Sequence, residues 1–212
     1  MGLKQLRFCL LVVGILGFAS TTKADTVAVN GSYSFASNGY GIPPYGGTLT
    51  SGGVTQSEQF YCVDFTHDIT GGMSWNVTTT SLSGSDFSST LLWSKLGSAS
   101  QNTYLAMAYL VTQMMGITQM DPASLLQKAE DQFAIWSLTG GPDPYGTDGS
   151  IVAAAIAAVQ ATGFNGAGFE ILTPTGSTGQ EFLVNTPEPS TLSLLVFGLL
   201  GLMIVGHRKL NI

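Results

Sequence analysis

The chain has 212 residues, of which 44% are hydrophobic and only 9% are charged, and its formal net charge is −6. Between residues 25 and 186 it contains two lysines, no arginine and twelve acidic residues. A body this acidic lacks the basic surface that nucleic acids attract, so we expect no nucleic-acid partner. Its roughly 160 residues are enough to bury one hydrophobic core.

The N-terminus has the three parts of a secretory signal peptide. A lysine and an arginine precede an apolar run over residues 8–18, and Thr22 and Ala24 then suit the small-residue positions of a signal-peptidase site. We expect a signal peptide over residues 1–24, cleaved by signal peptidase after Ala24. An uncleaved anchor is the alternative, although the apolar run is short for a membrane span.

The first half of the body predicts β-structure, because apolar and polar residues alternate along it. The pair Gly52-Gly53 separates two such segments and is typical of a hairpin turn. A serine-rich loop follows over residues 81–89. We expect strands over residues 26–36, 46–51, 54–65 and 73–79.

Helices are predicted in the middle of the body, over residues 103–115, 122–139 and 151–161. Asp121 suits the N-cap of the second helix, with proline at its first position and Gly140 beyond its end. Ser150 is a candidate cap for the third. Strands over 169–173 and 181–185 close the body, so we expect an α+β fold over residues 25–184, a β-rich domain with a mainly helical insert.

The C-terminal segment has three parts in order: Pro187-Glu188-Pro189, an apolar run over residues 192–205, and the basic residues Arg208 and Lys209. A helix over 190–206 would be about 25 Å long, at the short end of what spans a membrane. We expect a single transmembrane helix with the basic cluster in the cytoplasm. Residues 185–212 resemble the PEP-CTERM sorting signal of Gram-negative bacteria.

That resemblance implies a sequence of events during export. An exosortase in the inner membrane would recognise the tail and cleave near Pro187-Glu188-Pro189. The protein would be anchored in the inner membrane before processing and then reach the cell surface or the extracellular matrix. The resemblance also implies an association with exopolysaccharide and biofilm formation.

Two residues of the body are unusual for their positions. Gln132 lies in a helical stripe with Leu125, Ala129 and Trp136, on the face that a helix normally buries. Cys62 has no intramolecular disulfide partner once the signal peptide, with Cys9, is removed. In one interpretation Gln132 bonds to a neighbouring strand and Cys62 is an inert buried thiol. In the other, Cys62 attacks the Gln132 side chain, expels ammonia and leaves a thioester.

The segments Phe60-Tyr61-Cys62-Val63-Asp64 and Gln132-Phe133-Ala134-Ile135-Trp136 resemble the two motifs of bacterial surface thioester domains. This resemblance implies an internal thioester between Cys62 and Gln132, shielded from water by Tyr61 and Trp136, and covalent adhesion to amines such as lysine. The anchor departs from the pattern, because those adhesins mostly hang from Gram-positive walls by a different signal.

Other chemistry is weakly indicated. Cys62 and His67 could form a thiol hydrolase, but on one strand they would point to opposite faces. One cysteine and one histidine in the body are too few for a tetrahedral metal site, and we expect no metal, no cofactor and no enzyme activity. The leading hypothesis is a covalent adhesion module; the alternative is a non-reactive structural protein associated with matrix polysaccharide, and a secreted hydrolase ranks third.

Overall fold

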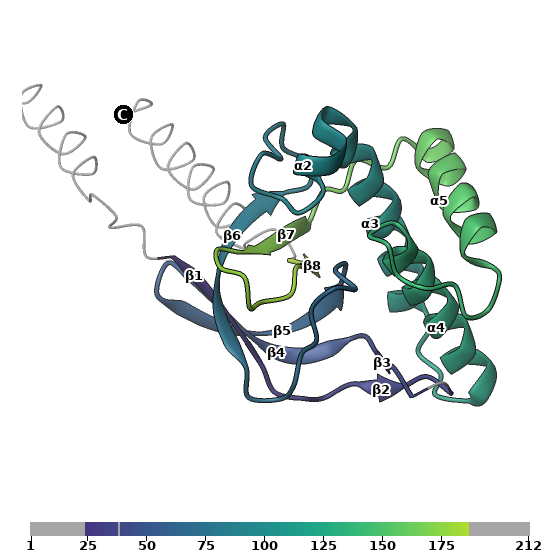
Figure 1. The fold of residues 1–212 in the computed structure, drawn as a ribbon, viewed down its shortest axis with the longest axis horizontal. Coiled ribbons are helices and arrows are strands. Elements are labelled where there is room, and N and C mark those ends of the chain that lie inside the picture. The colour runs from purple at the N-terminus through teal and green to yellow at the C-terminus, as the bar shows by residue number, and fades with distance from the viewer. Residues whose placement is uncertain (1–23, 38, 187–212) are drawn as a thin grey trace, which may run out of the picture.

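The computed structural model describes residues 24–37 and 39–186 of the chain (Figure 1). Residues 1–23 of the expected signal peptide (1–24), residues 187–212 of the expected sorting signal (185–212) and the expected transmembrane helix lie outside the described residues. Within residues 24–37 and 39–186, no helix has the length and apolar character needed to cross a membrane.

Six antiparallel strands form a closed barrel, with the spatial order β1-β4-β5-β8-β7-β6. They are β1 (Asp25–Val29), β4 (Tyr45–Ser51), β5 (Val54–Cys62), β6 (Ser74–Ser81), β7 (Phe169–Pro174) and β8 (Phe182–Asn185). Strands β7 and β8 come from the end of the body yet lie between β5 and β6. The helices are therefore an insert between two strands that pair, and the expected α+β architecture is confirmed.

The expected hairpin is confirmed and is formed by β4 and β5. Ser51 pairs with Val54, so the turn contains only Gly52 and Gly53, with φ of 56° and 84°. A two-residue turn with positive φ at both positions matches the twist of antiparallel strands, which explains the two glycines. A small second sheet of β2 (Ser34–Phe35) and β3 (Gly41–Ile42) precedes the hairpin.

Strand β5 ends at Cys62, three residues earlier than the sequence predicts. The carboxylate of Asp64 accepts hydrogen bonds from the backbone N–H and the hydroxyl of Thr66, at 2.8 and 2.5 Å. An aspartate that binds the backbone two residues ahead forms a local turn, which competes with the strand ladder. Val63 and Phe65, which the sequence analysis places in the strand, are apolar because they are buried or half-buried in the loop that follows β5.

The insert contains α2 (Trp93–Leu96), a 3-10 turn (Gly97–Ala99), α3 (Ser100–Gly116), α4 (Pro122–Ser137) and α5 (Asp148–Thr162). Asp121 caps α4 as expected, accepting from the backbone N–H groups of Ala123 and Ser124 at 3.0 and 3.2 Å. The expected cap of α5 is wrong. The N-cap is Thr147, and Ser150 lies in the first turn, where its hydroxyl donates to the Thr147 carbonyl.

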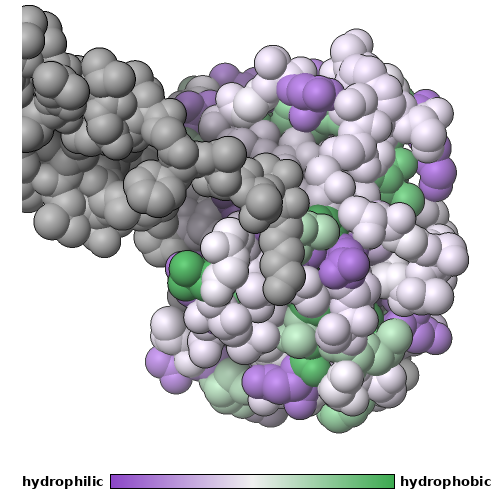
Figure 2. All heavy atoms as spheres, turned by 90° about the vertical axis from the view of Figure 1, so that its left-hand side faces the viewer, coloured by the Kyte–Doolittle hydropathy of each residue, from purple (hydrophilic) through white to green (hydrophobic). Residues whose placement is uncertain are grey.

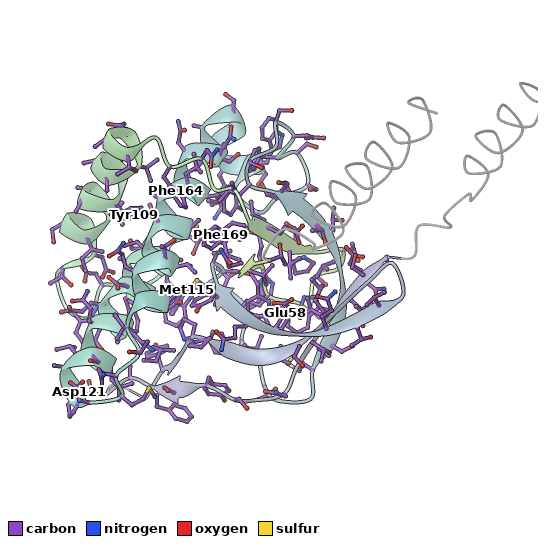
Figure 3. All side chains as sticks on the ribbon, turned by 180° about the vertical axis from the view of Figure 1, so that it is seen from behind. Glu58, Tyr109, Met115, Asp121, Phe164 and Phe169 are labelled. Atoms are coloured by element: carbon purple, nitrogen blue, oxygen red, sulfur yellow. The ribbon has the colours of Figure 1, made fainter. Side chains whose placement is uncertain are left out.

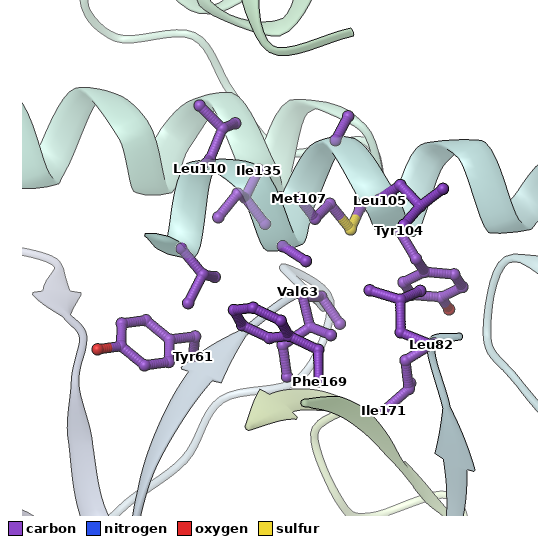
Figure 4. Packing of buried hydrophobic residues seen from close by; sticks show 14 of the residues in the cluster. Tyr61, Val63, Leu82, Tyr104, Leu105, Met107, Leu110, Ile135, Phe169 and Ile171 are labelled. Carbon is purple, nitrogen blue, oxygen red and sulfur yellow. The ribbon is translucent and has the colours of Figure 1, made fainter. Parts of the chain in front are cut away.

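The barrel wall separates two hydrophobic clusters. Alternate residues of β5 point to opposite faces, so Phe60 and Cys62 lie in the cluster inside the barrel and Tyr61 lies in the cluster facing the helices. Figure 4 shows the helix-facing cluster, in which Tyr61 and Phe169 lie beneath the helices. Two residues of α4, Phe133 and Trp136, join the barrel cluster.

Aromatic rings also tie the helices to the sheet on the outer side. Tyr109 of α3 packs edge-on against Phe164, which follows α5, and Phe164 packs in turn against Phe169 of β7, with centroid separations of 5.9 and 6.1 Å. These three residues are labelled in Figure 3. On the barrel-side face in Figure 2, most of the coloured residues are neither strongly hydrophilic nor strongly hydrophobic, in keeping with the low content of charged residues.

Candidate functional site at Cys62 and Gln132

Cys62 is the last residue of β5, and its side chain is fully buried inside the barrel. It is a free cysteine whose thiol donates to the Asp64 carbonyl at 3.1 Å. The indole N–H of Trp136 donates to Cys62 Sγ at 3.2 Å. Burial raises the pKa of the Cys62 thiol well above its ordinary value, and the Trp136 hydrogen bond opposes that rise only in part. The sulfur is therefore a protonated thiol at neutral pH.

Gln132 lies in the middle of α4, and its side chain is fully buried. Its Nε2 donates to the backbone carbonyl of Cys62 at 2.8 Å, across 70 residues of sequence. Its Oε1 is buried and has no hydrogen-bond partner among the described residues. The fold thus brings the two unusual residues of the sequence into direct contact, and Gln132 joins α4 to the end of β5.

Trp136 and Tyr61, the two residues expected to shield the thioester, lie in different places relative to the sulfur. Trp136 lies one helical turn after Gln132 and contacts the sulfur, as the shielding hypothesis requires. Tyr61 lies on the opposite face of β5, in the helix-facing cluster, so the structure does not bring its ring to the Cys62 side chain. Burial in that cluster raises the pKa of Tyr61 to about 12.

The remaining expected residues are either exposed or outside the described part of the chain. Ala24, the expected cleavage position, is exposed and directly precedes β1. Pro187, Glu188, Pro189, Arg208 and Lys209 lie outside the described residues. Lys128, one turn before Gln132 on α4, is buried, so one of the two body lysines lies near the site on the same helix.

His67 lies in the loop after β5, so the strand argument against a Cys62–His67 pair does not apply. Its Nδ1 lies 2.5 Å from Asp64 Oδ2, within hydrogen-bonding distance. The thiol contacts the Asp64 carbonyl and the Trp136 indole instead. Gln180 fixes this loop, because its Nε2 donates to the carbonyls of Asp64 and His67, both at 2.6 Å.

A pocket of about 110 Å³ opens beside Trp136. Its aromatic lining includes Tyr33, Tyr40, Phe65 and Trp136, and its polar lining includes His67, Asp68 and Gln180. The sequence did not predict this pocket, because its walls come from β2 and β3, the loop after β5, α4 and the turn before β8. Among the described residues no group of three or more histidine, cysteine or acidic side chains could hold a metal ion.

Comparison with protein families identifies one segment of the chain. The PEP-CTERM protein-sorting motif matches residues 185–209. No curated protein and no solved structure matches the chain. The motif indicates an exported protein that exosortase processes and that is sorted to the cell surface from a membrane-anchored form. The match covers the tail alone, and the comparisons do not support the resemblance of the body to thioester domains.

Proposed function

We propose that the body is a covalent adhesion module, in which Cys62 and Gln132 form an internal thioester that couples the exported protein to primary amines. The observation that carries this proposal is the direct contact between the Gln132 carboxamide and Cys62. The carboxamide nitrogen lies 2.8 Å from the Cys62 carbonyl oxygen, and the carboxamide oxygen has no partner among the described residues. The thioester keeps this oxygen and loses the nitrogen, so the support for the proposal is the closeness of the two residues in the core.

The proposed bond formation is balanced within the two side chains. Cys62 Sγ attacks the side-chain carbonyl carbon of Gln132, the C–N bond breaks, and the thiol proton leaves with the nitrogen as ammonia. The thiolate is the nucleophile, so the thiol must give up its proton as it attacks; burial keeps that proton on the sulfur until then, and it leaves with the nitrogen. An external primary amine later attacks the thioester carbon, an amide forms, and the Cys62 thiol is released.

The surroundings of the sulfur favour a long-lived bond. Both reacting residues are fully buried, and the Trp136 indole covers the sulfur, so water has poor access to an acyl group there. Only two lysines lie between residues 25 and 186, which limits attack from within the protein. Lys128 is the internal amine to test by substitution, because it lies on α4 one turn before Gln132.

The competing function is that of a non-reactive structural protein of the extracellular matrix. The same hydrogen bond from Gln132 to the Cys62 carbonyl favours it, because that bond fastens α4 to the barrel without any covalent chemistry. In this interpretation Cys62 is a buried thiol that packs as a small apolar residue. Export and sorting are common to both functions.

Intact mass of the purified full chain separates the two. A thioester makes the chain lighter by one ammonia than its processed sequence, leaves no titratable thiol from Cys62 under mild denaturation, and allows methylamine to add once with release of one thiol. The Cys62→Ser variant, processed in the same way, should have its full sequence mass and should not react with methylamine.

Two results count against the adhesion module. An unmodified mass with a free thiol in the denatured wild-type chain leaves the structural protein as the function. Loss of ammonia together with a free thiol means that an internal amine has consumed the bond, and restoration of the thioester in Lys128→Gln would identify that amine.

A further inference from the structure

We propose that the pocket beside Trp136 binds a primary alkylammonium group, such as the end of a lysine side chain. The role of this pocket as the docking point for the amine that attacks the thioester rests on the proposed function. Its reversible binding of an alkylammonium group does not depend on the thioester. Three independent features of the pocket point to this ligand: its aromatic rings, a buried acceptor without a donor, and its charge.

Three aromatic rings of the pocket lining pack against one another. Tyr40, Phe65 and Trp136 lie close together, with centroid separations of 6.0 Å between Tyr40 and Phe65, 6.2 Å between Tyr40 and Trp136, and 5.4 Å between Phe65 and Trp136. Tyr33 also lines the pocket and packs against Tyr45. A cation within about 6 Å of a ring centroid is attracted to the ring face.

Gln180 supplies the polar contact. Its side chain is 95% buried and lines the pocket, and its Nε2 is committed to the carbonyls of Asp64 and His67. Its Oε1 is buried and has no donor among the described residues. Since Nε2 holds the amide in this orientation, Oε1 remains an acceptor. Because Oε1 is itself buried, an ammonium N–H reaches it only when a neighbouring side chain of the pocket wall moves aside.

Charge and size select the ligand further. The lining contains the Asp68 carboxylate, the His67 ring, which is hydrogen-bonded to the Asp64 carboxylate, and no lysine or arginine, so the pocket favours a cation over an anion. An engineered apolar cavity of about 150 Å³ binds benzene. The volume here, about 110 Å³, suits an ammonium with a few methylene groups and is small for a sugar ring.

Trp136 connects the pocket to the sulfur. The residue lines the pocket and also donates its indole N–H to Cys62 Sγ at 3.2 Å. Rotation of this one side chain would therefore open a path from the bound amine to the acyl group. The exposed rings of Phe35 and Tyr40 at the pocket, 62% and 44% exposed, provide a surface that a partner protein carrying the lysine can contact.

The test uses n-butylammonium and the full chain carrying Cys62→Ser, which contains no thioester. Binding is followed through the indole N–H signal of Trp136, one of only three tryptophans in the sequence. We expect saturable binding, weakened about two- to fivefold by Asp68→Asn and by a similar factor in Tyr40→Leu. Asp86→Asn and Trp93→Leu, which change an exposed acid and an exposed ring outside the pocket, should leave the affinity unchanged.

The result separates the pocket from the thioester. Equal binding of the neutral comparator 1-butanol, or the absence of saturable binding, overturns the alkylammonium site even if methylamine adds to the wild-type chain. Reversible binding in Cys62→Ser together with an unmodified wild-type mass supports the site and overturns the thioester. Unchanged affinity in both Asp68→Asn and Tyr40→Leu places any binding elsewhere and overturns the proposal.

Discussion

The indole N–H of Trp136 donates to Cys62 Sγ at 3.2 Å, and this contact joins helix α4 to the end of strand β5 inside the barrel. The ring that covers the sulfur also packs edge-on against Phe65 and Phe133. Trp136 is therefore at once a core residue, a hydrogen-bond donor to the thiol and a wall of the neighbouring pocket. Changes at this residue should affect stability and thiol chemistry together.

We expect Trp136→Phe to lower the free energy of unfolding by about 1–2 kcal/mol, because it removes a buried hydrogen bond and leaves a small void. The measurement is urea unfolding of the full chain. Trp93→Phe is the matched control, since Trp93 is 37% exposed and lies outside both core clusters. Equal effects of the two substitutions would show that the contact with the sulfur contributes nothing.

Gly141 gives a prediction about how tightly this site is packed. Its backbone N–H donates to the Trp136 carbonyl at 2.8 Å, and a Cβ there would lie 2.8 Å from Trp136 Cβ and 3.0 Å from Phe65 Cγ. Gly141→Ala should therefore destabilise the fold by about 1–3 kcal/mol and shift the Trp136 indole signal.

The control for Gly141 is Gly149→Ala, in the first turn of α5. A Cβ at Gly149 would meet no atom within 4 Å, and alanine favours the helix by up to about 1 kcal/mol over glycine. The two substitutions should change thermal stability in opposite directions. Loss of stability in both would mean that the close approach to Trp136 is not the cause.

Asp148 should make stability depend on pH. Its carboxylate is buried, and neither oxygen accepts a hydrogen bond from a donor among the described residues. Burial, followed by the nearby Asp143 and Glu130, raises the pKa of Asp148 to about 6. The folded state then binds more protons than the unfolded state between pH about 4 and 6, so the free energy of unfolding should fall as pH rises through that range.

Asp148→Asn should reduce this slope, to which the buried Asp131 also contributes, and stabilise the protein at pH 7 by about 1–2 kcal/mol, after allowance for solvent screening. Chemical unfolding at pH 4 and pH 7 measures it. Asp86→Asn removes the same charge from an exposed loop, where hydrogen bonds from Ser88 lower the pKa of the aspartate, and should give no gain at pH 7. A gain from both variants would point to the overall negative charge instead.

Glu181 is a buried carboxylate that joins the helices to the barrel. It accepts from the Tyr104 hydroxyl at 2.6 Å, the Thr173 hydroxyl at 2.6 Å and the Leu91 backbone N–H at 2.8 Å. Burial raises its pKa, and these three donors oppose the rise.

Removing the acceptor should be costly. We expect Glu181→Leu to destabilise the fold by about 3–5 kcal/mol, because three buried donors lose their partner. Glu181→Gln keeps one oxygen for Leu91 and Thr173 and should cost about 1 kcal/mol. Equilibrium unfolding of both variants measures the difference, and equal losses would show that the hydrogen bonds are not the stabilising element.

Much of the secondary structure was predictable, because local signals sit at the element ends. The two glycines of the β4–β5 turn, Asp121 before α4 and the short apolar runs of β7 and β8 each act within a few residues. The early end of β5 was missed because the Asp64 side chain, which forms the turn, reads in sequence as part of a strand motif. Helix α2 was missed because its four residues carry too little pattern.

Among the buried polar residues in and around the candidate site, some were found from local sequence pattern and others were not. Gln132 and Cys62 were noticed because a polar residue on a buried helical face and an unpaired cysteine are anomalies of local pattern. Gln180 and Glu181 gave no such signal, since polar residues beside a glycine-rich turn are ordinary. Their importance comes from partners more than 70 residues away, Tyr104 for Glu181 and Asp64 for Gln180.

By itself the sequence determined the tail and its sorting, the order of the barrel strands and the three long helices along the chain, and the identity of the two residues that stand out chemically. These depend on short-range pattern, which a linear chain carries in full. Only the tertiary structure decided that β7 and β8 close a barrel between β5 and β6, that Tyr61 faces away from the sulfur while Trp136 covers it, and that a pocket lies beside them. Those features depend on which distant segments pack together, and packing is settled by the burial of the whole core.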